Sequence, residues 1–309
     1  MLSRNITSEG KDPIKTYKRG RNITSTGKET IITYKRRRVR RCDIPEVPEE
    51  LITEILLRLP VRSLARFKCV CKAWQNTISD PIFVRSHLLH SATKQEQKPS
   101  FLITPHKLDT VIDDEDWPTT FSNNFSFFQW QYGNDNMRLL HAMNFHGEFH
   151  SVGFMSHCDG LVLFPTDTNV YVINPATGDV LKLPEGQKDA KSSYWPTVGF
   201  GFDPRSNTYK VARYFYRSVN YTMQTYDAGM EVFTIGQDGS DCWREIVESP
   251  PYSLHGMQVA VHCKGSLIWM ISEMLAKPHP NVLLRFSLEN ENFSLIPYPC
   301  TSLPIDQYI

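Results

Sequence analysis

Residues 47–74, VPEELITEILLRLPVRSLARFKCVCKAW, decide how the first folded segment of this chain is built. Pro48 suits a first helical position, because its missing N–H would have no helical partner there. Glu49 and Glu50 follow in the first turn, where negative charge meets the positive end of the helix dipole. Pro60 ends this helix. The apolar side chains that share one stripe, with Leu57 outside it, are Leu51, Ile52, Ile55, Leu56 and Leu59.

Two further short helices are predicted after Pro60. Ser63 is a good N-cap for the second helix. Its apolar side chains recur at spacings of 3, 4, 3 and 4 residues, at Leu64, Phe67, Cys71, Trp74 and Ile78. Asp80 can cap a third helix that Pro81 opens. One face of this last helix carries Phe83, His87 and Leu88, so the pattern predicts three helices over residues 44–90.

A helical unit this small buries too little surface to be secure alone. Part of its apolar surface is therefore expected to meet something else. Each large side chain buried in such a contact contributes about 1.5–3 kcal/mol, so a handful of them is enough to hold a partner. The alternative is that the helices simply pack on the body of the same chain.

Residues 47–88 resemble the F-box family along its full length, through the Pro48 start, the centre EILLRLPVRSLARFKCVCKAW and the exit ISDPIF. Val47 departs from the pattern, since the family usually has leucine there. The resemblance implies docking onto a Skp-type adaptor, and through it a cullin, in an SCF-type ubiquitin ligase. It leaves open which matching positions form the adaptor face and which form the core beneath it. These positions are Val47, Pro48, Ile52, Ile55, Leu56, Leu59, Pro60, Leu64, Val70 and Trp74.

The first 42 residues differ in composition from the rest of the chain. Residues 1–41 hold 13 Lys and Arg against 3 Asp and Glu, a net charge of +10, whereas the remainder holds 21 against 30, a net of −9. Residues 4–20 nearly repeat as residues 21–37, with 12 of 17 positions identical. A polar, basic duplication with few apolar side chains cannot bury a core, so we expect residues 1–42 to be a disordered tail.

The tail ends in a basic run, whose charged members are Lys35, Arg36, Arg37, Arg38, Arg40 and Arg41. Such a run is typical of a nuclear localisation signal, so the nucleus, the cytoplasm or both are expected as the location. A nucleic-acid-binding arm and a solvated charged tail are the alternatives. The net negative body argues against an extended basic surface, so we do not expect nucleic acid as the main partner.

The cysteine count and the apolar runs limit the class of protein. The chain has seven cysteines without a dense framework, which favours a reduced intracellular protein over a disulfide scaffold. No run of 18 or more apolar residues occurs, so no membrane span is expected.

Residues 91–150 are predicted to form a polar linker followed by irregular segments and first strands. From residue 151 the pattern changes to strands and turns, and SHCDGLVLF at 156–164 is echoed by VHCKGSLIWMI at 261–271. About three such repeats, each ending in strand, turn, strand and proline, favour a propeller-like domain of repeated antiparallel sheets over residues 151–309. A β-sandwich is the alternative.

This half also resembles a family. The segments CDGLVLF, VINPATGDVLKLP, VGFGFDPRSNTYKVAR, EVFTIGQDGSDCWREI, CKGSLIWMI and FSLIPYP occur in the order seen in the F-box-associated domain of plant F-box proteins. Members usually continue well past the last of these segments, so the domain is expected to be short or open at one edge. The expected organisation is α+β and multidomain. It comprises a disordered basic tail (1–42), a three-helix F-box (43–90), a linker with first strands (91–150) and an all-β, propeller-like domain (151–309).

The resemblance implies a substrate-recognition subunit of a ubiquitin ligase, which works by proximity and needs no catalytic residue of its own. The pairs His157-Cys158 and His262-Cys263 would each offer one ligand to a shared metal site, so we expect neither metal nor cofactor. The target protein, whose identity the sequence leaves unknown, is expected on loops 185–196, 217–229 and 272–281. A nuclear nucleic-acid binder, an enzyme on a propeller scaffold and a truncated, non-functional receptor are the alternatives.

Overall fold

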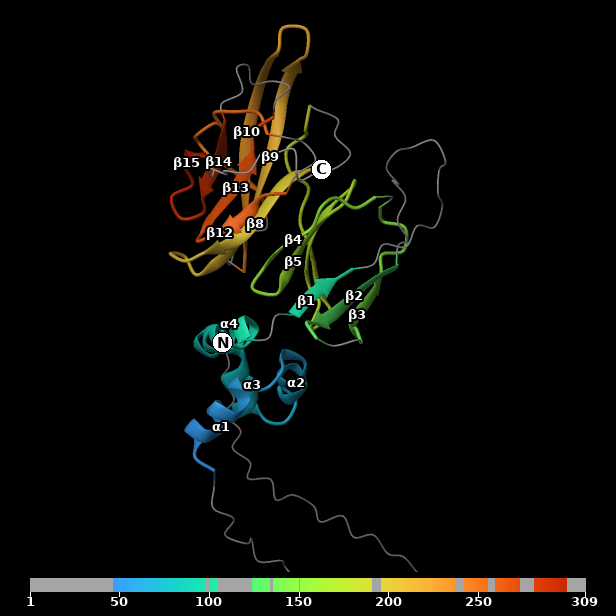
Figure 1. Ribbon diagram of the computed structural model, residues 1–309, viewed down its shortest axis with the longest axis vertical. Helices are drawn as coiled ribbons and strands as arrows, with labels where there is room; N and C mark the ends of the chain where they lie inside the picture. Colours follow the sequence, from blue (N-terminus) through green and yellow to red (C-terminus); the bar gives the residue numbers. More distant parts are fainter. Residues whose placement is uncertain are drawn as a thin grey trace, which may run out of the picture. The chain divides into compact units, whose positions relative to one another are not determined.

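The computed structural model places most of the chain between residues 47 and 298 (Figure 1). The residues that the structure describes are 47–97, 100–104, 124–133, 136–149, 151–190, 196–236, 242–254, 259–272 and 281–298. The expected disordered tail, its duplication and the basic run at residues 35–41 lie outside these ranges.

The described residues begin with four helices: α1 (Glu49–Leu57), α2 (Val61–Phe67), α3 (Lys72–Ser79) and α4 (Pro81–Gln97). Pro48 and Pro60 stand directly before α1 and α2, where neither removes a helical hydrogen bond. Asp80 caps α4, because its Oδ1 accepts the N–H of Ile82 at 2.7 Å. The predicted start of the last helix, with Asp80 as cap and Pro81 in the first turn, is therefore confirmed.

The single helix predicted from Ser63 to Ile78 is divided into α2 and α3. The backbone at Cys71 is extended, with φ −159° and ψ 165°, and its Sγ accepts the N–H of Trp74 at 3.5 Å. Cys71 is thus an exposed cap of α3 rather than a core residue of one longer helix. Pro60, not Ser63, holds the capping position of α2. The segment consequently has four helices where the pattern predicts three.

The helices enclose a small core of their own. Leu56, Leu64, Ile78 and Phe83 are buried in it, and five half-buried side chains pack against them: Ile52, Leu57, Leu59, Phe67 and Trp74. The predicted stripe of α1 is partly wrong, since Leu51 and Ile55 are exposed and Leu57 packs inward. The side chains that face the core are Ile52, Leu56 and Leu59, which follow each other at spacings of four and three residues. Leu51 and Ile55 therefore lie on another side of the helix.

Four antiparallel sheets follow, and each is built from strands that are consecutive in the chain (Figure 1). The first sheet contains β1 (Ser100–Ile103), β2 (Asn124–Gln131) and β3 (Arg138–Asn144). The second contains β4 (Ser156–Cys158), β5 (Leu161–Pro165), β6 (Val170–Asn174) and β7 (Asp179–Lys182). The third contains β8 (Thr197–Asp203), β9 (Thr208–Asn220), β10 (Thr225–Ile235) and β11 (Arg244–Glu245). The fourth contains β12 (Val261–Cys263), β13 (Ser266–Met270), β14 (Val282–Ser287) and β15 (Phe293–Pro297).

This arrangement confirms the predicted repeated sheets of a propeller-like domain, rather than the two sheets of a sandwich. The repeat seen in the sequence corresponds to the same hairpin in the second and fourth sheets. Asp159 and Gly160, between β4 and β5, have φ of 51° and 84°, and Lys264 and Gly265, between β12 and β13, have φ of 45° and 69°. Two consecutive left-handed residues form the tight turn that matches the twist of a hairpin, which explains the glycine in both copies.

Neighbouring sheets pack face to face. Successive side chains of a strand point to opposite sides, so one strand can contribute to two different cores. Phe125 of β2 packs with Phe164 of β5 between the first and second sheets. Leu163, the neighbour of Phe164, instead packs with Phe200 of β8 between the second and third sheets. The second sheet therefore has two buried faces, as expected for a repeat that is covered by its neighbours on both sides.

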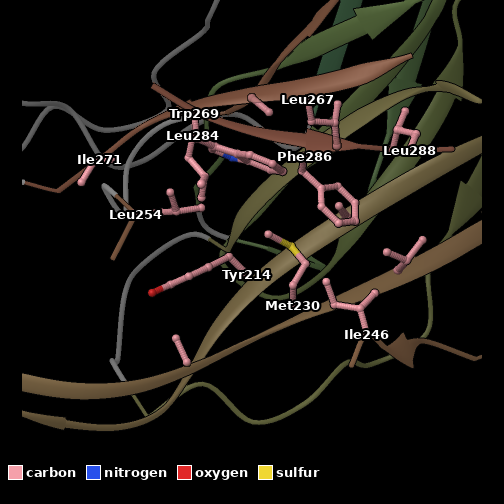
Figure 2. Packing of buried hydrophobic residues seen from close by; sticks show 14 of the residues in the cluster. Tyr214, Met230, Ile246, Leu254, Leu267, Trp269, Ile271, Leu284, Phe286 and Leu288 are labelled. Atoms are coloured by element: carbon pink, nitrogen blue, oxygen red, sulfur yellow. The ribbon is translucent and has the colours of Figure 1, made fainter. Parts of the chain in front are cut away.

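The core between the third and fourth sheets is the largest of the three (Figure 2). Tyr214 and Met230 of the third sheet meet Trp269 and Phe286 of the fourth, and each of these four side chains is at most 2% exposed. The close approach requires a glycine in β8: a Cβ at Gly199 would lie 2.6 Å from the Cβ of Ala260 and 2.8 Å from Cζ2 of Trp269.

A buried cation also joins these two sheets. The Nζ of Lys210 lies 2.8 Å from Oδ2 of Asp203 and 3.1 Å from Oε1 of Glu291, and it donates to the carbonyl oxygen of Leu288 at 2.7 Å. Lys210 and Asp203 belong to the third sheet, whereas Leu288 and Glu291 lie in the β14–β15 connection. The lysine therefore links the two sheets through charge-assisted hydrogen bonds.

Candidate functional site

The first candidate site is a row of apolar side chains on the outer side of α1. Leu51 and Ile55 are four residues apart in α1, so they share one side of the helix. They are 54% and 57% exposed, respectively, and Val47, which precedes the helix, is 52% exposed. We name Leu51 and Ile55 the α1 row. The core of the helical segment is formed without them, so the row is available to another surface.

Other exposed apolar positions lie in and after α2. Pro60 and Val61 are exposed at its start, and Val70 is 59% exposed in the turn between α2 and α3. Large apolar side chains are individually common at protein surfaces, but six of them within 24 residues are a concentration that suits a protein interface.

The structure separates the ten predicted adaptor-binding positions into three groups. The exposed ones are Val47, Pro48, Ile55, Pro60 and Val70. The half-buried ones are Ile52, Leu59 and Trp74, and the buried ones are Leu56 and Leu64. The exposed group can contact a partner directly, whereas the buried pair belongs to the core beneath.

Sequence reasoning did not include Leu51 among the adaptor-binding positions, although the structure places it in the α1 row. Its spacing of four from Ile55 is the signal that identifies it. The single apolar stripe assigned to α1 hid this relationship, because it combined residues from two sides of the helix.

Buried contacts hold the helices that carry the row. The Nε2 of His87, on α4, donates to the carbonyl oxygen of Leu59 at 2.8 Å, and His87 is 7% exposed. Leu59 lies between α1 and α2, where its carbonyl has no partner within a helix. The rings of Phe67 and Trp74 pack with their centroids 5.4 Å apart across the α2–α3 turn. These contacts fix the turns on either side of α2.

One exposed ion pair lies on α1. Arg58 pairs with Glu54 at 2.7 Å, and more than half of each side chain is exposed. Exposed pairs of this i, i+4 kind stabilise a helix by about 0.3–0.5 kcal/mol. This pair therefore contributes little to the stability of the helix that carries the α1 row.

The comparisons with known proteins agree with both halves of the chain. The F-box domain family matches residues 44–86. The F-box associated beta propeller domain family matches residues 110–308, more than half of the chain. The chain belongs to the F-box-associated family. Its helical segment is accordingly an F-box, and strands β2 to β15 lie within the range matched by the F-box-associated domain.

Relatives of this F-box protein are found in the plant Arabidopsis thaliana. One F-box relative from Arabidopsis thaliana is 28% identical over 84% of this chain and 60% of its own length. F-box protein At2g21930 of the same plant is 27% identical over 81% of this chain and 60% of its own length. F-box protein At1g11270 is 25% identical, over 81% of this chain and 74% of its own length. The chain spans about three fifths of the length of several curated relatives that it matches.

Among solved structures, an alpha-L-arabinanase of Penicillium chrysogenum is similar to this chain with a TM-score of 0.34 and 12% identity. The similarity covers 64% of this chain and 59% of the arabinanase. At this level it adds nothing to the assignment.

In the F-box-associated domain, the structure brings one member of each His-Cys pair together. The Sγ of Cys158 lies 3.5 Å from Nδ1 of His262, whereas His157 and Cys263 are exposed on the opposite sides of their strands. Burial raises the pKa of the Cys158 thiol to about 12, and burial also lowers the pKa of His262. A protonated thiol beside a neutral imidazole is neither an activated nucleophile nor a metal-binding thiolate.

Within the described ranges, no group of three or more His, Cys, Asp and Glu side chains is placed to hold a metal ion. The helices that the structure describes include none long and apolar enough to cross a membrane.

The three expected target loops are placed unequally. Residues 217–229 lie in the β9–β10 hairpin, which the structure describes in full. Residues 191–195 and 273–280, which form parts of the other two loops, lie outside the described residues.

Proposed function

We propose that this chain is the substrate-recognition subunit of an SCF-type ubiquitin ligase. In this proposal its F-box binds a Skp-type adaptor, and through it a cullin, while its F-box-associated domain holds a target protein. The chain acts by raising the effective concentration of the target near the ubiquitin-charged enzyme, so it contributes positioning rather than bond chemistry.

The α1 row carries this proposal. Leu51 and Ile55 are each more than half exposed, although the core of the F-box is formed by Leu56 and its neighbours. Covering two such side chains contributes a few kcal/mol, at about 25 cal/mol per Å² of apolar surface. An adaptor protein is the cover that the F-box family implies.

The test is co-purification of the tagged chain with a Skp-type adaptor from plant cells treated with a proteasome inhibitor. The variant Leu51→Asp/Ile55→Asp should lose the adaptor, because binding would bury unpaired charges. Both positions are exposed, so the variant should stay folded. The matched control is Leu89→Asp on α4, since Leu89 is 59% exposed but lies outside the row. Equal adaptor recovery from both variants would contradict the proposal.

Nuclear import is part of the same proposal and rests on the basic run at residues 35–41. Replacing Lys35, Arg36, Arg37 and Arg38 by alanine should move a fluorescent fusion of the chain from the nucleus to the cytoplasm. An unchanged distribution of the fusion would argue against a localisation signal at this position.

A further inference from the structure

The β9–β10 hairpin extends beyond both of its neighbours in the third sheet (Figure 1). The pairing of β8 with β9 ends at Tyr214, and the pairing of β11 with β10 ends at Glu231. The hairpin itself remains paired to Asn220 and Thr225, so residues 215–230 form a two-stranded ribbon. An isolated two-stranded ribbon is only marginally stable in water, so this one needs support at its base.

The base of the ribbon has that support. The N–H of Ala190 donates to the carbonyl oxygen of Tyr216 at 2.7 Å, and the Tyr216 hydroxyl lies 2.5 Å from Oγ of Ser253. Arg217 pairs with Asp227 at 2.9 Å across the ribbon and also with Glu245 of β11. These contacts hold the ribbon to the sheet from which it projects.

The tip of the ribbon has a fixed turn. Asn220 and Thr225 close the hairpin, and Oδ1 of Asn220 accepts the N–H of Met223 at 3.0 Å. Gln224 completes the turn with a left-handed φ of 54°. The backbone of such a turn loses little conformational freedom on binding, which favours affinity.

The tip presents apolar side chains without charge. Tyr221 is 58% exposed and Met223 is 74% exposed. Residues 218–226, SVNYTMQTY, contain no Asp, Glu, Lys, Arg or His, and the charged residues on either side of this segment, Arg217 and Asp227, pair with each other. Tyrosine is enriched among the side chains that dominate protein interfaces, and methionine adapts its shape to a partner pocket.

We propose that the tip of the β9–β10 ribbon is the primary contact for the target protein, and that Tyr221 and Met223 insert into an apolar pocket on that target. The proposal rests on the receptor function proposed above and names its site. The pocket should be bordered by neutral hydrogen-bonding groups, because the tip offers the Tyr221 hydroxyl and amide or hydroxyl side chains but no ionic partner. A nucleic acid is disfavoured as the occupant, since the tip has no cation to meet a phosphate.

The test places a photo-crosslinking amino acid at position 223 of the full chain in plant cells, with the proteasome inhibited and the adaptor present. The same amino acid at position 247 is the control, because Val247 is fully exposed and lies outside the ribbon. We expect position 223, but not position 247, to cross-link to a protein that is neither the adaptor nor a second copy of this chain. Cross-linking to a second copy, or to nothing, would overturn the proposal.

The half-life of the cross-linked protein then decides whether it is a target. Tyr221→Ser/Met223→Ser should lengthen that half-life several-fold and raise the Kd for the purified protein by about tenfold or more. Tyr221→Phe/Met223→Leu, which keeps size and apolarity, should retain turnover. If the adaptor-binding variant Leu51→Asp/Ile55→Asp lengthens the half-life of the cross-linked protein but Tyr221→Ser/Met223→Ser does not, the tip assignment is overturned. If neither variant lengthens that half-life, the proposed receptor function is contradicted, and the tip assignment with it.

Discussion

Ile55 and Leu56 are neighbours in α1, yet the side chain of Ile55 is 57% exposed and that of Leu56 is fully buried. Leu56 is therefore expected to contribute to the stability of the F-box, and Ile55 to the binding of the adaptor. Replacing Leu56 by alanine should lower the free energy of unfolding of the F-box by about 2–5 kcal/mol, whereas the exposed Ile55→Ala change should stay within about 0.5 kcal/mol. Thermal unfolding of the two variants measures the difference. Equal destabilisation would contradict the assigned faces of α1.

His87 is expected to hold the turn between α1 and α2. His87→Ala removes the hydrogen bond to the carbonyl oxygen of Leu59 and leaves that oxygen without its partner. The expected loss is about 1–3 kcal/mol in the free energy of unfolding, measured by denaturant titration. Leu89→Ala, on the exposed side of the same helix, is the matched control and should change little. A His87→Ala variant as stable as the control would show that the contact is dispensable.

Cys158 should resist thiol reagents in the folded protein. Burial and the nearby Asp159 carboxylate raise the pKa of its thiol from 9.0 to about 12, so almost no thiolate is present at pH 8. Cys69, Cys71 and Cys263 are exposed and should react with iodoacetamide at that pH. Because the pKa is higher in the folded state, the stability that this thiol contributes is present below pH 9 and is lost as the pH rises towards 12. Mass spectrometry of the labelled chain identifies the modified cysteines, and equally fast labelling of Cys158 would contradict its burial.

Lys210 is expected to stabilise the contact between the third and fourth sheets. Lys210→Ala leaves the buried Asp203 carboxylate without its cation and should lower the free energy of unfolding by about 3–5 kcal/mol. Replacing Asp203 and Lys210 together, as Asp203→Asn/Lys210→Met, should cost less, since no buried carboxylate remains at position 203 and Glu291 still pairs with Arg244. Calorimetric unfolding compares the two variants, and a single variant no worse than the double would show that the pair is not coupled.

Acid should weaken the same contact. Burial opposes ionisation of Asp203, but the hydrogen bonds from Lys210 and Ser206 outweigh it, so the pKa of Asp203 is lowered from 3.8. A carboxylate with a lowered folded-state pKa contributes stability above its unfolded pKa, and this contribution is lost as the pH falls below 3.8 towards the lowered value. On acidification from neutral pH to below pH 3.8, the free energy of unfolding should therefore fall less in Asp203→Asn than in the wild type. An identical loss in both proteins would contradict the shift.

Local chemistry explains which parts of the fold could be predicted from the sequence. Proline at helix starts and the Asp80 cap act through their immediate neighbours, so both were predictable. The paired turns at Asp159-Gly160 and Lys264-Gly265 also follow from local backbone preference. The break at Cys71 was not predicted, because the 3 and 4 spacing of apolar residues continues through it and both α2 and α3 pack on the same core.

Long-range packing explains what could not be predicted. The inner and outer sides of α1 are both apolar, so periodicity alone could not separate Leu51 and Ile55 from the core residues. The proximity of Cys158 and His262 spans 104 residues and depends on how the sheets pack. Residues 217–229 were expected to be a loop, whereas residues 217–220 and 225–229 lie in β9 and β10. The extension of this hairpin depends on where the pairing with β8 and β11 stops.

The most direct test of the receptor assignment is calorimetric titration of the purified chain with a Skp-type adaptor, followed by the same titration with Leu51→Asp/Ile55→Asp. We expect the wild-type chain to bind with a Kd of about 1 μM or tighter, and the double variant to bind at least about 100-fold more weakly while unfolding at the wild-type temperature. A wild-type chain that shows no heat of binding to the adaptor, or a double variant that binds as tightly as the wild type, would contradict the assignment of the α1 row as the adaptor-binding surface.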